Sequence, residues 1–489
     1  MKTIKKFLLL AIIILVCLCV YLAYNTLNFK SKQVNTEPIE IINIGDSSIQ
    51  NFSDALKIQT ISYENTSDFD SVQFEKFSTF LKRTYPLTDS ILEKKTFNSY
   101  SYLYYLKGSK PELKPIILMG HLDVVPVIQE NLSDWKMTPF SGEVKNDTIW
   151  GRGTIDDKVG VIGIMEAIEY LLEDNFKPKR SIYISLGHDE EIGGRNGALI
   201  IAKYLKEQGV EAEFVVDEGG SITQGMIPDI EKDVALIGIA EKGFISLELS
   251  VKLEGGHSSM PEKETAIDVI ANAVTKLKSN PFPAKISEPL EGFIEYLGPE
   301  MPLLNKIVFA NQSILKSLII NVYEKSSSGN AMIRTTTSPT IFNSGVKDNI
   351  IPQFAKATIN FRIDPENTTE SVIKRVKETI NDERITITEG NFSSNPSKVS
   401  STTGLGFNTI SKTIKQLYPN VLIAPYLVVG ATDSRHFNDI SENIFRFSPV
   451  IMNSTNIKSF HGLNERMAVK DFNNSVRFYV QLLKNSSLE

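Results

Sequence analysis

The chain has 489 residues, of which 42% are hydrophobic and 22% are charged. This length exceeds that of a typical single domain, and the composition is that of a folded globular chain, so wholesale disorder is excluded. The formal net charge of -6 lacks the basic excess of a nucleic-acid-binding protein, and that class is also excluded.

An uncharged apolar run, residues 7–24, follows three lysines close to the N-terminus. As a helix it would be about 27 Å long, close to the roughly 30 Å of a bilayer core. We expect a retained signal anchor, with 1–6 as a cytoplasmic tail, 7–24 as the transmembrane segment and 25–45 as a tether. A cleaved signal peptide is the alternative, although its apolar core is usually only about 7–15 residues long. Either way, the rest of the chain is expected on the extracytoplasmic side, anchored or secreted.

Both cysteines of the chain, Cys17 and Cys19, lie inside this apolar run. The exported part therefore has no thiol for a nucleophile, a disulfide or a thiolate metal site. Any metal in that part must be bound by imidazole and carboxylate groups.

Residues 46–242 alternate short β-rich runs with helical runs, which favours an α/β layered fold with a mostly parallel central sheet. In such sheets the functional loops lie at the carboxyl ends of the strands. Buried strands are expected at 115–120, 181–187 and 213–217, and helices at 159–174 and 197–209.

Residues 243–393 follow a different order, strand-helix-strand-strand-helix-strand, which is typical of a ferredoxin-like α+β domain. Within this segment, 288–334 has no clear periodicity and receives no assignment. Residues 394–489 return to a mixed α/β pattern. We therefore expect one catalytic domain, built from 46–242 and 394–489, with the α+β domain inserted between its two parts.

The first motif with chemical content is GHLDVVP at 120–126. His121 and Asp123 are two residues apart at the expected end of a strand, so both side chains point to the same face. A metal-bound imidazole usually donates its other N–H group to a carboxylate, and Asp123 is placed to accept it. A His-x-Asp pair at a strand end also arises by chance, so this motif alone is not decisive.

Carboxylates gather in three further clusters. Asp156 and Asp157 precede an expected helix, where a simple N-cap is the alternative explanation. The acidic run 189–191 follows a buried strand, where the alternative is a solvated turn, and Asp217 and Glu218 end another strand. Adjacent carboxylates repel each other unless a cation compensates them. A metal with one neighbouring carboxylate kept as a general base would explain these clusters.

The chain has five histidines, and all of them lie in such carboxylate-rich or glycine-rich motifs. They are His121, His188, His257, His436 and His461. Histidines together with several carboxylates, and without cysteine, suit a dinuclear zinc site.

These motifs, in this order, resemble the co-catalytic zinc metallopeptidases that include aminoacylase, glutamate carboxypeptidase and succinyl-diaminopimelate desuccinylase. Within that family the chain is most similar to carboxypeptidase S and N-fatty-acyl-amino acid synthase/hydrolase. The likeness spans 120–467. It rests on GHLDVVP, WGRGTIDDK, LGHDEEIGG, DEGG, GHSSMP, RTTTSPTIFNSGVKDNIIP, FRIDP, GATDSRH and HGLNER.

The resemblance implies a zinc-peptidase-like catalytic domain whose inserted domain serves as a lid and a dimerisation surface. It also implies two Zn²⁺ per subunit. His121 and Glu218 would bind one ion, Glu191 and His461 the other, and Asp156 would bridge them, with a cis peptide to the next residue. Asp217 is the alternative to Glu218.

The same resemblance assigns roles in catalysis. Glu190 would be the general base, and Asp123 would orient His121. His257, on the inserted domain, would polarise the scissile carbonyl, often across a dimer interface in relatives. The residues expected on the substrate-carboxylate and oxyanion side are Asn349, Arg362 and Arg435.

The resulting expectation is a zinc-dependent hydrolase that cleaves an amide bond next to a free C-terminal carboxylate. It would act as a carboxypeptidase or dipeptidase, or as an N-acyl-amino acid deacylase, and the sequence leaves these open. The alternative is a catalytically inactive, membrane-anchored binding protein on the same fold, which should have lost ligands or the base. The expected partners are the substrate, the membrane through the N-terminal helix, and a second copy of the chain through the lid.

Overall fold

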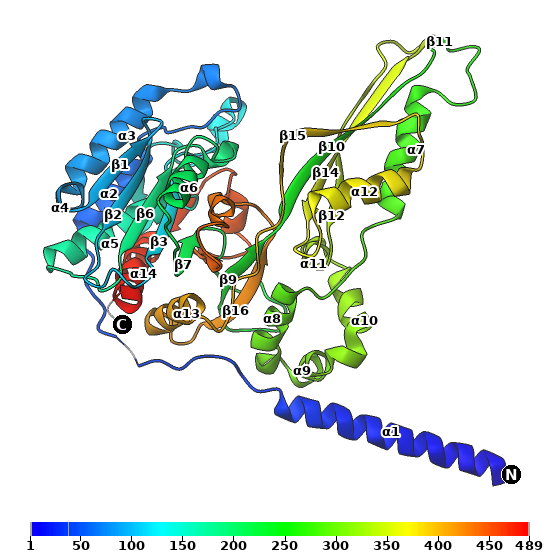
Figure 1. The fold of residues 1–489 in the computed structure, drawn as a ribbon, viewed down its shortest axis with the longest axis horizontal. Helices are drawn as coiled ribbons and strands as arrows, with labels where there is room; N and C mark the ends of the chain where they lie inside the picture. Colours follow the sequence, from blue (N-terminus) through cyan, green and yellow to red (C-terminus); the bar gives the residue numbers. More distant parts are fainter. Residues whose placement is uncertain (1, 38, 488–489) are drawn as a thin grey trace.

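The computed structural model describes residues 2–37 and 39–487, which form an α/β body, a smaller α+β domain and a projecting N-terminal helix (Figure 1). The body contains a 10-stranded sheet with the order β1-β2-β6-β3-β7-β17-β9-β8-β18, and β16 pairs with β9. Its strands are β1 Glu93–Phe97, β2 Ser101–Leu106, β3 Ile116–His121, β6 Ile182–Gly187, β7 Phe214–Asp217, β8 Ile222–Thr223, β9 Val234–Glu241, β16 Leu422–Val428, β17 Ile444–Arg446 and β18 Ile451–Met452.

The centre of this sheet, β6-β3-β7-β17, is parallel, whereas β1 and β2 join it antiparallel at one side and β17 pairs antiparallel with β9. The sheet is therefore mixed, and the expected parallel arrangement holds at its centre. Alternate residues of β3 enter two different hydrophobic clusters, Ile116 and Leu118 on one face and Ile117 and Met119 on the other. Helices consequently cover both faces of the sheet.

Two helices of the body were predicted, and the corresponding α5 and α6 lie within two residues of the predicted ranges at each end. The helices of the body are α2 Asp46–Leu56, α3 Ser71–Thr84, α4 Pro86–Ile91, α5 Lys158–Glu173, α6 Ala198–Glu207, α13 Leu405–Leu417 and α14 Val469–Ser487. A small sheet of β19 Arg466–Ala468, β5 Thr148–Trp150 and β4 Glu143–Lys145 lies in the same body. Short 3-10 helices are η1 Thr66–Asp68, η2 Gln129–Asp134, η3 Glu190–Ile192, η4 Gly298–Glu300, η5 Asp433–Phe437 and η6 Asn456–Ser459.

The smaller domain has the strand order β12-β14-β10-β15, with antiparallel pairs throughout and its own hydrophobic core. Together with α7 and α12 it has the β-α-β-β-α-β order. Its elements are β10 Gly243–Lys252, α7 Ala266–Ser279, β12 Thr336–Ser344, β14 Phe354–Ile363, α12 Thr369–Ile380 and β15 Thr386–Ser394. A two-stranded ribbon, β11 Gly256–His257 and β13 Ile350–Ile351, forms its tip (Figure 1).

The segment without clear periodicity, 288–334, folds into the short 3-10 helix η4 and four α-helices: α8 Glu288–Leu297, α9 Leu303–Ala310, α10 Gln312–Tyr323 and α11 Ser327–Met332. The helices are short, and the side chains of α9 are half-buried or exposed, so no single apolar period runs through the segment. α8 packs against β16 and so attaches these helices to the α/β body.

The N-terminal helix α1, Lys2–Asn28, is longer than the predicted transmembrane segment 7–24. Among the described residues it is the one single helix long and apolar enough to cross a membrane, with mean hydropathy 3.0 and 0% of its apolar window buried. Between α1 and α2 the described residues 29–37 and 39–45 form no helix or strand, and Gln33 donates to the carbonyl of Ile423 in β16 at 2.9 Å.

Candidate metal centre and active site

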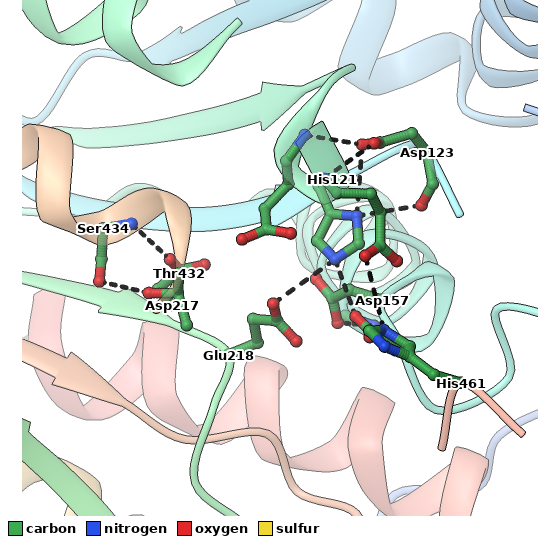
Figure 2. Close-up of polar contacts among 12 residues, drawn as sticks. His121, Asp123, Asp157, Asp217, Glu218, Thr432, Ser434 and His461 are labelled. Atoms are coloured by element: carbon green, nitrogen blue, oxygen red, sulfur yellow. Dashed lines mark hydrogen bonds and ion pairs between the residues drawn. The ribbon is translucent and has the colours of Figure 1, made fainter. Parts of the chain in front are cut away.

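The candidate site lies where three neighbouring parallel strands end. His121 is the last residue of β3, the acidic run 189–191 follows β6, and Glu218 follows β7. Because β3 pairs in parallel with both β6 and β7, the carboxyl ends of these strands meet at one edge of the sheet. The loop before α5 adds Asp156, and the loop before β19 adds His461, which is labelled in Figure 2 together with His121 and Glu218.

Two groups of potential metal ligands form at this edge. His121, Asp156 and Glu218 make one group, and Asp156, Glu191 and His461 make the other. Within each group the ligand atoms lie within 4.8 Å of one another. All five residues expected as zinc ligands are therefore brought together from five separate segments of the chain.

Asp156 is common to both groups and contacts both histidines. Its Oδ1 is 2.9 Å from Nε2 of His121, and its Oδ2 is 2.7 Å from Nε2 of His461. The Asp156–Asp157 peptide bond is cis, and Asp157 caps α5 by accepting a hydrogen bond from the amide of Gly160 at 3.2 Å. The carboxylate of Asp156 thus lies between His121 and His461 and is shared by the two donor groups.

Contacts with Asp123 fix the orientation of the His121 ring. Its Nδ1 is 3.0 Å from the backbone carbonyl of Asp123, which can only accept, so Nδ1 carries the proton. The same nitrogen lies 3.4 Å from Oδ1 of the Asp123 carboxylate. Nε2 therefore faces Asp156 and Glu218, and it is the ring nitrogen that would bind a metal.

Asp123 also holds the acidic turn after β6. Its Oδ1 accepts from the amide of Glu190 and its Oδ2 from the amide of Glu191, both at 3.1 Å. The buried Asp123 carboxylate thereby holds the backbone of Glu190 and Glu191 in place and also lies close to His121. Glu190 belongs to neither donor group.

The electrostatics of the cluster fit a bound cation. Desolvation raises the pKa of Glu218 well above its usual range and that of Glu191 above its usual value. Hydrogen bonds to Asp156 and Glu191 raise the pKa of His461 to about 10. In addition, Oε1 of Glu191 is buried and has no hydrogen-bond partner among the described residues. The carboxylates of the two groups lie close together, and a bound cation would compensate their negative charge. Imidazole and carboxylate donors together suit zinc.

The two adjacent acids after β7 point to different places. Glu218 Oε1 lies 3.5 Å from Nε2 of His121, whereas Asp217 Oδ2 accepts a hydrogen bond from the amide of Ser434 at 2.8 Å (Figure 2). Asp217 therefore anchors the 430–437 loop to the sheet, and the geometry favours Glu218 as the ligand.

The remaining histidines of the body have contacts of other kinds. Nδ1 of His188 is 2.6 Å from the hydroxyl of Ser101, and its ring packs near Phe69, Phe74 and Tyr100. Nε2 of His436 is 3.1 Å from the carbonyl of Gly193. These contacts hold the loops that carry the acidic residues.

His436 gives the stability of the protein a distinct pH dependence. Burial, with a further contribution from Arg435, lowers the pKa of His436 from 6.5 to about 4. The unfolded chain therefore binds a proton at His436 near pH 6.5 and the folded chain only near pH 4. The free energy of unfolding consequently falls as pH falls through this window. We expect His436→Gln to reduce the loss of unfolding free energy between pH 7 and pH 5 by about 2 kcal/mol. Urea unfolding at both pH values measures this, and equal losses in the two proteins would contradict it.

A buried ion pair that the sequence motifs did not single out joins the two loops at the centre of the site. Nη1 of Arg152 is 2.6 Å from Oε2 of Glu465, and both side chains are buried. Glu465 Oε1 also accepts from the amide of Ile155 at 2.8 Å, and Arg152 Nη2 donates to the carbonyl of Gly462 at 3.1 Å. The pair thereby positions the neighbours of Asp156 and His461.

Removal of Arg152 is expected to cost far more than removal of an exposed arginine. Arg152→Ala leaves the Glu465 carboxylate buried and unpaired, and breaking such a pair costs about 3–5 kcal/mol of unfolding free energy. Arg384, whose exposed side chain pairs with Asp382 and Glu264, provides the matched control, and Arg384→Ala should cost less than about 1 kcal/mol. Urea unfolding of both variants checks this, and similar small losses would refute it.

The substrate-side residues are divided between two places. His257 lies in β11 and Asn349 directly precedes β13, so both are exposed at the tip of the smaller domain, away from the donor groups of the same chain (Figure 1). Arg362 lies at the base of that domain, 4.9 Å from the ring of Phe244, and Arg435 lies in the body, 5.5 Å from the ring of Phe392. The single chain therefore brings together the ligands and Glu190, but not His257 and Asn349.

The fold and this site define a metallopeptidase-type α/β enzyme. A solved M20 family metallo-carboxypeptidase from Sulfolobus solfataricus, Sso-CP2, superposes with a TM-score of 0.69 at 18% identity, over 91% of this chain and 100% of that one. The model of Peptidase family M20/M25/M40 matches residues 117–485, and the chain belongs to this family.

Curated relatives resemble the chain over most of its length. A probable carboxypeptidase S-like 2 from Dictyostelium discoideum is 41% identical over 98% of this chain and 95% of its own. The N-fatty-acyl-amino acid synthase/hydrolase PM20D1 from Xenopus tropicalis is 39% identical over 89% of this chain and 85% of its own. The protein is therefore an enzyme of the peptidase/amidohydrolase type, as the sequence motifs indicated.

Proposed function

We propose that the protein is a two-zinc hydrolase that cleaves an amide bond next to a free carboxylate. The observation that carries this proposal is the pair of donor groups that share Asp156, with Glu190 on the same loop as a ligand but outside both groups. His121 and Glu218 would hold one zinc, Glu191 and His461 the other, and Asp156 both. Bound zinc ions supply an acidified water and polarise a carbonyl.

Glu190 is the proposed general base. Desolvation raises the pKa of its carboxyl well above the usual range, and the acidic neighbours Asp433, Glu218 and Glu191 add to the effect, whereas His121 opposes it. A carboxylate beside the two donor groups could accept a proton from the attacking water and then donate it to the departing amine. The hydrogen bond from the Glu190 amide to the Asp123 carboxylate keeps Glu190 beside the two donor groups.

The inserted domain is proposed to supply the substrate side of the site. Arg362, with Arg435 from the body, offers guanidinium groups suited to paired hydrogen bonds with a carboxylate. Because His257 and Asn349 lie at the exposed tip, we propose that they reach a site through a second copy of the chain, with the inserted domain as the dimer contact. In that arrangement His257 stabilises the oxyanion.

The apolar helix α1 and the relatives support the remaining parts of the proposal. α1 is proposed to anchor the enzyme, with the catalytic body on the extracytoplasmic side. Peptides and N-acyl amino acids both present an amide beside a carboxylate, so both classes fit the site. The name of the Dictyostelium relative favours the first class, and that of the Xenopus relative favours the second.

A matched pair of substrates tests the requirement for a carboxylate. We expect an N-acyl amino acid to be hydrolysed with a kcat/KM about 10–100-fold higher than its C-terminal carboxamide, since a charge-assisted hydrogen bond contributes about 1.5–3 kcal/mol. The same comparison with a dipeptide and its carboxamide, and between the two classes, ranks the substrates. Equal kcat/KM for the acid and the amide would refute recognition of a free carboxylate.

A further inference from the structure

The helices α9 and α10 carry an apolar surface that the catalytic site does not use. The exposed side chains are Leu303, Leu304, Ile314, Leu318 and Val322, with exposed fractions of 66%, 77%, 52%, 47% and 56%. The last three recur at every fourth residue and so lie along one face of α10. Figure 1 shows these helices at the edge of the body beside α1.

The C-terminal end of α1 is attached to the junction of α9 and α10. Asn25 Nδ2 donates to Oδ1 of Asn311, the residue between the two helices, at 2.9 Å. Asn311 Nδ2 in turn lies 3.3 Å from the carbonyl of Leu22. The ring of Phe29 lies against Gly298. The two helices therefore lie at the point where the apolar helix joins the catalytic body.

Charge and length indicate how these helices would meet a bilayer. The segment 301–323 contains Lys306 and Lys316 and no acidic residue, so no carboxylate within it would repel phosphate headgroups. The two helices have 8 and 12 residues and are bent by 119° at their junction. At 1.5 Å per residue they are about 12 and 18 Å long, too short for either to cross a core of roughly 30 Å. A position in the interface is therefore favoured over a span.

We propose that α9 and α10 form a docking surface that lies in the interface of the bilayer in which α1 is anchored. This inference rests on the anchoring proposed above. Leu303, Leu304 and the apolar face of α10 would enter the boundary between headgroups and acyl chains, about 5–10 Å deep. Because α8 joins these helices to β16, the surface would hold the catalytic body in one orientation at the membrane, close to substrates that partition into lipid.

Spin labels on the full chain in phosphatidylcholine vesicles test this surface. One label is placed at Leu304→Cys in a Cys17→Ser/Cys19→Ser background. A second, at Val346→Cys in the same background, marks the tip of the smaller domain, where Val346 is 93% exposed. A third, on native Cys17 with Cys19→Ser, marks α1. We expect the ratio of collision rates with oxygen and with a water-soluble nickel chelate to be several-fold higher at 304 than at 346, and also high at 17.

The other outcomes overturn the inference in distinguishable ways. If the label at 17 lies in lipid while the label at 304 matches that at 346, the docking surface is wrong and the anchor stands. If the label at 17 also gives the aqueous value, the proposed anchor fails and the docking surface fails with it. If the label at 304 is shielded from both reagents and shows dipolar broadening, a second copy of the chain covers the surface instead of lipid.

Discussion

Glu190→Gln is expected to retain its zinc and to lose turnover by about 10²–10⁴-fold, the usual contribution of a general base. The amide of glutamine cannot accept the proton of the attacking water, although it has nearly the same shape as the carboxylate. Zinc should remain because Glu190 belongs to neither donor group, and its backbone hydrogen bond to Asp123 does not depend on the side chain. Turnover and zinc content of the same preparation give the result.

Glu207→Gln serves as the matched control, since Glu207 is an exposed residue near the end of α6. This variant should have unchanged turnover and zinc content. Near-normal turnover of Glu190→Gln would remove Glu190 from the mechanism. Loss of zinc from that variant would instead make Glu190 a ligand, which would contradict its proposed role as a general base outside the two donor groups.

Asp156→Ala is expected to abolish both binding of zinc at stoichiometric levels and activity. Its carboxylate contacts both histidines, so its removal leaves each donor group with only two protein ligands, fewer than the usual three or four. Loss of a metal centre removes several kcal/mol of transition-state stabilisation, which corresponds to about 10³-fold or more in rate. Metal analysis and turnover measure the two losses separately.

A second aspartate provides the comparison for this variant. Asp134 is exposed at the end of η2, and Asp134→Ala should bind zinc and turn over as the original chain does. Urea unfolding establishes that Asp156→Ala still folds. If a folded Asp156→Ala protein kept two zinc ions, a bridging role for Asp156 would be wrong.

The parts of the site that the sequence predicted are those carried by local pattern. The apolar runs before His121, His188 and Glu218 predict buried strands, and parallel strands place their carboxyl ends together, so these motifs had to converge. The scarcity of histidine and the position of both cysteines limited the donor set further. The β-α-β-β-α-β order of the inserted domain was readable from alternation and helical spacing for the same reason.

The parts that the sequence did not predict depend on long-range contacts. The Arg152–Glu465 pair joins residues 313 positions apart, and each residue alone looks like an ordinary polar side chain in a glycine-rich loop. The short helices of 288–334 bury short faces against one another and against β16. Each helix is therefore too short to show a clear helical repeat of apolar residues in the sequence. The exposed positions of His257 and Asn349 follow from their place at the β11–β13 ribbon, which forms the tip of the inserted domain and is not indicated by motif spacing.

Zinc content of the purified full chain tests the central claim most directly. We predict about two zinc ions per folded chain, and about one in His461→Ala, because only one donor group loses its histidine while Asp156 remains to both. Fewer than one zinc per folded chain in the unmodified protein would contradict the proposed two-zinc site, and with it the amide hydrolysis derived from that site.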